Sequence, residues 1–329
     1  MNNHFYYYSL IALNLYTLIL KHNLVKELYP ASVAGLSYEI YTTEKGLIIR
    51  TGGYSENVHL LFDTIFDYMK NFEKNLKEEI FNTIKMQQEK NYYNSLNKPK
   101  TLNNNLRINI IEYTNISLYK KYNLIKTIKI EDVKNFSVHF LNEIKLKVLV
   151  QGNYNKEMTM NFFNKTLLKL NNSKEIIDKK LIENFAYKLP VGQNFIRINT
   201  FNHNDINTII TNYYQANKIS IRLTCLLDLI ILIVEEPLFN ILRTKKQLGY
   251  DISINIRDNN GILGYTISVN SQENKFNSEY VENEIEEFNL NIINIIKNIT
   301  SKDFNHYKQS LIDLKEVVDN ELKDEVKLY

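Results

Sequence analysis

Three side chains near the middle of the second half of the chain have the types and spacing to act on a polar substrate. They are Phe239, Arg243 and Tyr250, within the segment EEPLFNILRTKKQLGYDI. A guanidinium and a phenol both donate hydrogen bonds, and neither is a preferred metal ligand. Such donors can stabilise the negative charge that develops on a carbonyl oxygen during acyl transfer. The segment is therefore the first candidate for chemistry.

The same segment reads as a short helix that runs directly into a strand. Pro237 fits a first helical turn, where its missing N–H costs nothing. Gly249 is expected to end the helix in the left-handed conformation. Phe239 and Arg243, four residues apart, then share one helix face. The pattern thus predicts an arginine and an aromatic ring side by side, with Tyr250 opening the next strand.

A purely structural role for these residues is the alternative. Tyr250 could be an ordinary strand aromatic, and Arg243 could pair on the surface with Glu235, Glu236 or Glu39. An internal repeat weakens this alternative for the arginine. Tyr38 in the first half matches Tyr250, whereas Ala31 stands at the position of Arg243. The tyrosine therefore fits a shared scaffold, and the arginine is peculiar to the second half.

The histidines do not form a metal site in the sequence. A zinc site needs at least three protein ligands that converge on one point. No H-x-x-E-H or H-E-x-x-H motif occurs, and we predict that this chain alone holds no metal and no other cofactor. The six histidines are His4, His22, His59, His139, His203 and His306.

Composition places the chain among ordinary globular proteins. It has 329 residues, 44% hydrophobic and 23% charged, with a net charge of +3. That charge is small and mixed with acids, which argues against a nucleic-acid partner. The single cysteine, Cys225, excludes an internal disulfide and fits a reducing compartment. It lies in an apolar run, LTCLLDLIILIV, and is expected in the core.

The apolar start, FYYYSLIALNLYTLIL, could be mistaken for a membrane span. Polar residues interrupt it, and Lys21 ends it after fewer residues than the roughly twenty that a span requires. It also lacks the features of a signal peptide. We expect a buried core helix, no membrane partner and a cytoplasmic location.

The two halves of the chain repeat one pattern. In each, an apolar helix precedes a strand with Tyr, an acid and Ile, and a glycine-containing turn leads to a returning apolar strand. Two helices follow in both copies. The turns are 43–46 and 258–261, and Asn-Gly in the second favours a tight hairpin. The fold class is therefore α+β, with two similar units of helices and an antiparallel sheet.

The two copies differ at their edges. Strands are predicted at 194–201 and 207–216 before the second long helix, without a counterpart in the first copy. A strand at 145–153 is predicted after the first copy only. We interpret the chain as residues 1–185, a unit truncated at its start, and 186–329, a unit truncated at its end. A fragment, a split-gene product or a truncated gene model would each explain this pattern.

The segment around Arg243 resembles a known family. EEPLFNILRTKKQLGY is similar to the EP-x-F-N-x-LRTK-x-QLGY string of insulin-degrading enzyme and its insulinase/pitrilysin relatives, which are zinc metallopeptidases with an inverted H-x-x-E-H motif. AGLSYEIYTTEKGLIIRTGGY, from Ala34 to Tyr54, is similar to the third of their four domains. The family's zinc site belongs to the first domain.

The resemblance implies a role for each candidate. Arg243 would hydrogen-bond the substrate backbone, Tyr250 would stabilise the oxyanion, and Phe239 would line a side-chain pocket. It implies a peptide substrate, with zinc in a missing N-terminal half that would be the partner. By this interpretation the chain is the C-terminal half of a zinc metalloendopeptidase and is inactive alone. Alternatives are a non-catalytic scaffold or interaction protein of the same fold, or an expressed remnant of such a gene.

Overall fold

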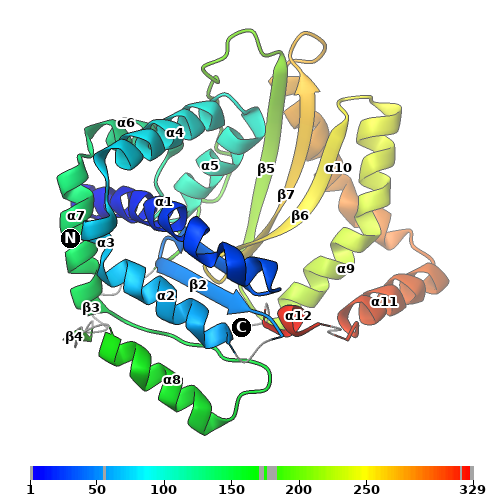
Figure 1. Ribbon diagram of the computed structural model, residues 1–329. Helices are drawn as coiled ribbons and strands as arrows, with labels where there is room; N and C mark the ends of the chain where they lie inside the picture. Colours follow the sequence, from blue (N-terminus) through cyan, green and yellow to red (C-terminus); the bar gives the residue numbers. More distant parts are fainter. Residues whose placement is uncertain (1–2, 55–56, 170–173, 176–183, 319–320, 327–329) are drawn as a thin grey trace. The chain divides into compact units, whose positions relative to one another are not determined.

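The computed structural model describes residues 3–54, 57–169, 174–175, 184–318 and 321–326 (Figure 1). The chain divides into two compact units, of which one comprises residues 1–93, 119–183 and 320–329 and the other residues 94–118 and 184–319. One break lies beside the predicted division at residue 185. The second unit also takes residues 94–118 because helix α5, Pro99–Ile111, packs on strand β5, Asn207–Lys218. Residues 170–173 and 176–183, before this division, lie outside the described residues.

The first unit is built around a long buried helix and a hairpin. Helix α1, Asn3–Val33, contacts strand β1, Ser37–Thr43, which pairs antiparallel with β2, Gly46–Gly52. The apolar start is a core helix as predicted: the Tyr16 ring is fully buried and lies 4.4 Å from the ring of Phe72, centroid to centroid. Within the described part of the chain, no helix is long and apolar enough to cross a membrane.

Short helices complete this unit. They are α2 (Val58–Lys70), α3 (Phe72–Asn75), α4 (Glu78–Leu96, which runs into the second unit), α6 (Leu118–Thr127), α7 (Ile130–Asn142), α8 (Lys156–Lys169) and α12 (Leu322–Val326). The predicted strand at 145–153 is wrong. Only β3, Glu143–Ile144, pairs with β4, Lys174–Glu175. Apolar alternation gives a segment strand propensity, but a strand also needs a neighbour to receive its backbone hydrogen bonds.

The second unit contains an antiparallel sheet in the order β5-β7-β6. Strand β6, Asp251–Asn259, turns at Asn260–Gly261 into β7, Ile262–Gln272, which confirms the predicted hairpin. Strand β5 confirms the strand predicted at 207–216. The strand predicted at 194–201 does not form; most of these residues are exposed, and none belongs to a strand.

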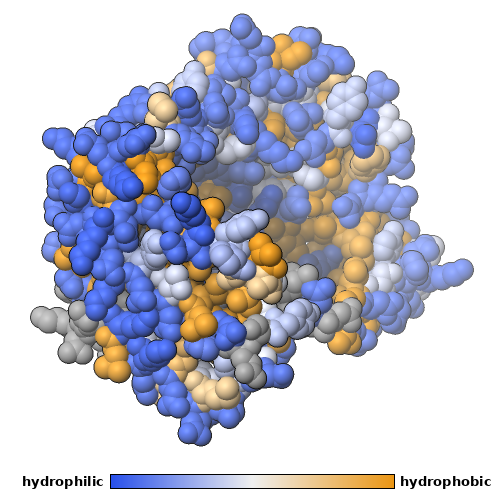
Figure 2. Space-filling view, in the orientation of Figure 1, coloured by the Kyte–Doolittle hydropathy of each residue, from blue (hydrophilic) through white to orange (hydrophobic). Residues whose placement is uncertain are grey.

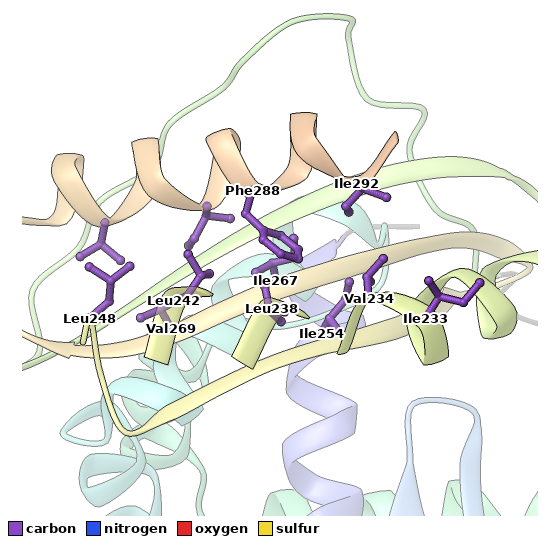
Figure 3. Close-up of a cluster of buried hydrophobic side chains, with 12 residues drawn as sticks. Ile233, Val234, Leu238, Leu242, Leu248, Ile254, Ile267, Val269, Phe288 and Ile292 are labelled. Carbon is purple, nitrogen blue, oxygen red and sulfur yellow. The ribbon is translucent and has the colours of Figure 1, made fainter. Parts of the chain in front are cut away.

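Helices cover both faces of this sheet. Helix α9 (Ile221–Leu238), the π-helical turn η2 (Phe239–Lys245) and helix α10 (Ser278–Lys297) enclose the apolar core with one face, while α5 lies against β5 (Figure 1). Figure 3 shows Leu238, Leu242, Ile254 and Phe288 meeting in this core. Helix α11, Ser301–Lys315, packs on α9. The predicted α+β class, with helices on antiparallel sheets in two units, is thus confirmed.

Two sequence expectations fail on α9. This helix begins at Ile221 and runs through Pro237, so Pro237 does not open a separate helix. Ser220 caps its start by accepting a hydrogen bond from the Leu223 N–H. Cys225 is exposed rather than buried, because it lies on the side of α9 that does not meet the core. Hydrophilic side chains cover much of the face shown in Figure 2, with hydrophobic ones among them.

Two stacked tyrosines connect the sheet to α10 and make the stability of the second unit sensitive to alkaline pH. Tyr214 donates to Glu286 at 2.7 Å, and Tyr265 donates to Asn289 at 2.6 Å. Burial, followed by the charge of Glu286, raises the pKa of Tyr265 to about 12. Burial and its hydrogen bond to Glu286 also raise the pKa of Tyr214. Both phenols are therefore held neutral in the folded state.

We expect the free energy of unfolding to fall as pH rises from about 10 towards 12. A raised folded-state pKa stabilises the fold below the unfolded pKa, and this stability is lost as pH passes through the folded value. The slope is at most about 1.4 kcal/mol per pH unit for each tyrosine. Urea unfolding at several pH values measures it. Tyr265→Phe should reduce the slope, whereas Tyr29→Phe, at an exposed position, should not.

Candidate functional site

A π-helical turn presents the candidate arginine. Residues Phe239–Lys245 continue α9 with a wider winding, and the Lys246 N–H donates to the Ile241 carbonyl, five residues back, at 2.9 Å. Pro237 lies just before this turn; it lacks the N–H that would continue the α-helical ladder, and its ring crowds the carbonyl of Ile233, four residues earlier. Single π turns occur frequently at functional sites.

The end of this turn differs from the sequence expectation. Gln247, with φ of 54°, takes the left-handed conformation that was predicted for Gly249. The Leu248 N–H then donates to the Leu242 carbonyl at 3.0 Å, which closes the turn. Leu242 and Leu248 are both buried and anchor the segment in the core (Figure 3). A residue in the left-handed region is strained when it is not glycine, and such strain clusters at functional positions.

Glycine is needed at position 249 for a different reason, because the backbone there passes very close to strand β7. A Cβ built at this residue would lie 1.9 Å from the carbonyl oxygen of Asn270 on β7. Only glycine therefore lets the chain pass against the sheet at this point. The next residue is Tyr250, so the glycine fixes the backbone from which the candidate phenol projects.

Arg243 and Phe239 are together, as predicted. The guanidinium carbon of Arg243 lies 4.5 Å from the centroid of the Phe239 ring. This cation–π contact orients the guanidinium without consuming its hydrogen-bond donors. Arg243 is exposed and makes no ion pair with any described residue, so the surface pairs considered as a structural alternative do not form.

Tyr250 lies beyond the turn and opens towards solvent. Tyr250 is 79% exposed and makes no hydrogen bond or ring contact with any described residue. It therefore does not contact Arg243 or Phe239. Its backbone is held on both sides. Leu248 is buried before it, and Asp251 after it pairs with Lys100 of α5 at 2.8 Å. The phenol is therefore a free donor on a fixed support.

An ion-pair cluster fastens the end of the turn to α10. The Lys246 ammonium pairs with Glu284 and, at 2.9 Å, with Glu287. Glu284 is largely buried, so this contact is less screened than a surface pair. Lys246 therefore serves as an anchor, whereas Arg243 remains exposed.

The described residues do not suit a metal centre. No group of three or more histidine, cysteine, aspartate or glutamate side chains among them could hold an ion. This donor set does not fit zinc, and we derive no step through a metal held by this chain. What the arrangement offers is two hydrogen-bond donors, a guanidinium and a phenol.

Comparisons with known proteins agree with this architecture. Residues 7–124 match the model of the middle or third domain of peptidase M16, and residues 229–329 match that of the PQQ synthase PqqF-like C-terminal lobe domain 4. Human nardilysin is 36% identical over 97% of this chain, and human insulin-degrading enzyme is 28% identical over 90%. The chain spans 28% and 29% of their lengths, respectively.

A solved structure extends the similarity to the fold. Pitrilysin superimposes on this chain with a TM-score of 0.72, at 14% sequence identity. The superposition covers 96% of this chain and 33% of the pitrilysin chain. A conserved protein from Enterococcus faecalis gives 0.67 over 94% of this chain and 76% of its own. The matched domains and the fold are of the kind found in peptidase M16 proteins. The chain belongs to the insulinase/pitrilysin family.

Proposed function

We propose that this chain is the substrate-contacting C-terminal part of an insulin-degrading-enzyme-like zinc metalloendopeptidase. In this role it closes the chamber around a peptide, while an N-terminal half holds the zinc and the general base. The chain contributes donors rather than a metal. The observation that supports this proposal most directly concerns Arg243. Its side chain is exposed, stacks on Phe239 and has no ion-pair partner among the described residues.

The donors suit the electrostatic needs of peptide hydrolysis. When the carbonyl carbon becomes tetrahedral, its oxygen gains negative charge, and preorganised donors stabilise it. The Tyr250 O–H can donate to that oxygen, because its phenol is exposed and has no other partner among the described residues. The Arg243 fork can hold a neighbouring backbone carbonyl of the peptide. Phe239, 44% exposed, offers its ring to an apolar side chain of the substrate.

A reconstitution assay tests this function. The chain is mixed with a zinc-bearing N-terminal half of a family member, and cleavage of an internally quenched peptide is followed. We expect neither part to cleave alone and the mixture to cleave. Stable association without cleavage would contradict the catalytic role and favour a non-catalytic interaction protein of the same fold.

A further inference from the structure

A second group of positive charges lies on the sheet face opposite the apolar core. There an open hollow of about 320 Å³ lies between α5 and the three strands of the second unit. Short hydroxyl and amide side chains line most of it, including Thr211, Ser253 and Ser268. Arg257 of β6 lies at this hollow. The Arg243 segment does not line it.

Arg257 is oriented with its terminal nitrogens uncommitted. Its Nε donates to the buried Thr266 hydroxyl at 3.2 Å, which fixes the plane of the guanidinium. Among the described residues, its two Nη groups make no hydrogen bond and no ion pair. A guanidinium held by its Nε presents two parallel N–H donors, the geometry that matches a carboxylate.

Arg107 of α5 adds a second positive charge, part of which is buried. Its Nε and Nη1 are inaccessible to solvent and donate no hydrogen bond to any described residue. Its guanidinium carbon lies 5.9 Å from the centroid of the Tyr213 ring. Gly264 permits this arrangement, because a Cβ there would come within 2.9 Å of the Tyr213 ring. Leaving buried charged donors unsatisfied is unfavourable, and a nearby anion would offset the cost.

The surrounding charges compensate this pair only in part. Asp251, the acid that lines the hollow, is already paired with Lys100. Burial lowers the pKa of Arg107, and the positive charge of Arg257 lowers it further, which shows that the two cations repel each other. Glu112 attracts Arg107 and offsets part of this lowering. Lys100 and Asp251 in the lining pair with each other, so Arg257 is the charged side chain of the lining that has no ion-pair partner among the described residues. Arg107 lies outside the lining as a second positive charge close enough to act on Arg257.

We propose that this hollow binds a peptide carboxylate, either a free C-terminus or an acidic side chain, on the Nη groups of Arg257, with Arg107 as the supporting charge. The hydroxyl and amide groups of the strands would hold the adjoining peptide bonds. The hollow is at the small end of ligand-sized pockets, so it accommodates the end of a peptide rather than a folded partner.

Binding of labelled peptides to the full chain tests this site. Three tetrapeptides with the same uncharged fluorescent label are compared by anisotropy at low ionic strength: trialanyl-alanine with a free C-terminus, its amide, and an amide with one glutamate. We expect the amide without glutamate to bind about tenfold more weakly than at least one charged peptide, as for loss of a hydrogen bond to a charged group. Which charged peptide binds identifies the source of the carboxylate.

Matched variants locate the site. Arg257→Gln should abolish the preference for charge, and Arg107→Gln should reduce it. Arg107→Lys should preserve it in large part, because lysine keeps the charge. Arg222→Gln, at an exposed arginine of α9, is the control and should bind as the wild type does. Circular dichroism checks that each variant is folded.

Two results would overturn the proposal: equal binding of neutral and charged peptides, or a preference for charge that survives in folded Arg257→Gln and Arg107→Gln chains. The measurement needs neither zinc nor cleavage. A negative result in this binding test would therefore leave the proposed catalytic role untouched. A negative result in the cleavage assay would likewise leave the carboxylate site untouched.

Discussion

Replacing Arg243 with alanine should lower kcat/KM for peptide cleavage by about 10²–10³-fold in the reconstituted mixture, the range observed when one preorganised oxyanion donor is removed. Tyr250→Phe should lower it by a similar order, because it deletes the donor and keeps the ring. The loss for Tyr250→Phe should fall mainly on kcat, since its bond to the oxyanion strengthens as charge develops in the transition state. The loss for Arg243→Ala should also raise KM, because its contact with the peptide backbone is made in the ground state as well.

The variants separate catalysis from folding. Arg243 and Tyr250 are exposed and have no hydrogen-bond partner among the described residues, so their replacement should change the free energy of unfolding by less than about 0.5 kcal/mol. Arg243→Lys keeps the charge but loses the planar fork, and intermediate activity is expected. Arg222→Ala is the matched control. Wild-type cleavage by Arg243→Ala and Tyr250→Phe would refute the assignment.

The second hairpin could be predicted because two local signals agree. Alternating isoleucines mark one buried face of β6, and Asn260–Gly261 provides the turn. The strand predicted at 194–201 shows the limit of such signals. Its residues have strand propensity, but most remain exposed and none belongs to a strand. Sheet membership depends on a partner strand, and partner availability is a property of the folded unit rather than of the segment.

The candidate site was predictable in composition but not in backbone geometry. The spacing of Phe239 and Arg243 placed them on one face, and the structure confirms their contact. The choice of Gly249 as the left-handed residue was wrong. Once the turn widens to π geometry, the chain reverses two residues earlier, at Gln247. Pro237 was interpreted as the start of a helix, whereas α9 runs through it and winds wider from Phe239 onwards, so the local signal pointed to the wrong geometry.

Arg107 and Arg257 show what sequence reasoning missed. One lies on a helix after residue 94 and the other on a strand in the second half, so their proximity is visible only when α5 packs on the sheet of the second unit. Arg257 stands on the polar side of β6, where its neighbours Ser253 and Asn255 also face the hollow. The alternation of polar residues along β6 indicates a solvent-facing side of the sheet. The nearness of Arg107 to Arg257 could not be predicted from it.

Gly249→Ala should be the most destabilising small substitution near the site. The added Cβ would lie 1.9 Å from the Asn270 carbonyl oxygen, and both groups belong to backbone that cannot rotate away. The segment must then withdraw from β7, at a cost of about 1–3 kcal/mol or more, as for overpacked interiors. Urea unfolding of the full chain measures the loss. The substitution should also displace Tyr250. Cleavage should therefore fall even at urea concentrations below those that unfold the chain.

Gly52→Ala is the matched control for this prediction. Gly52 ends strand β2 of the first hairpin, and a Cβ there would meet its nearest atom, the Ser37 hydroxyl, at 3.4 Å, an ordinary contact. Its backbone does not occupy the left-handed region. An unchanged free energy of unfolding is therefore expected for Gly52→Ala. Equal stability of the two variants would mean that close approach to β7 is not what requires glycine before Tyr250.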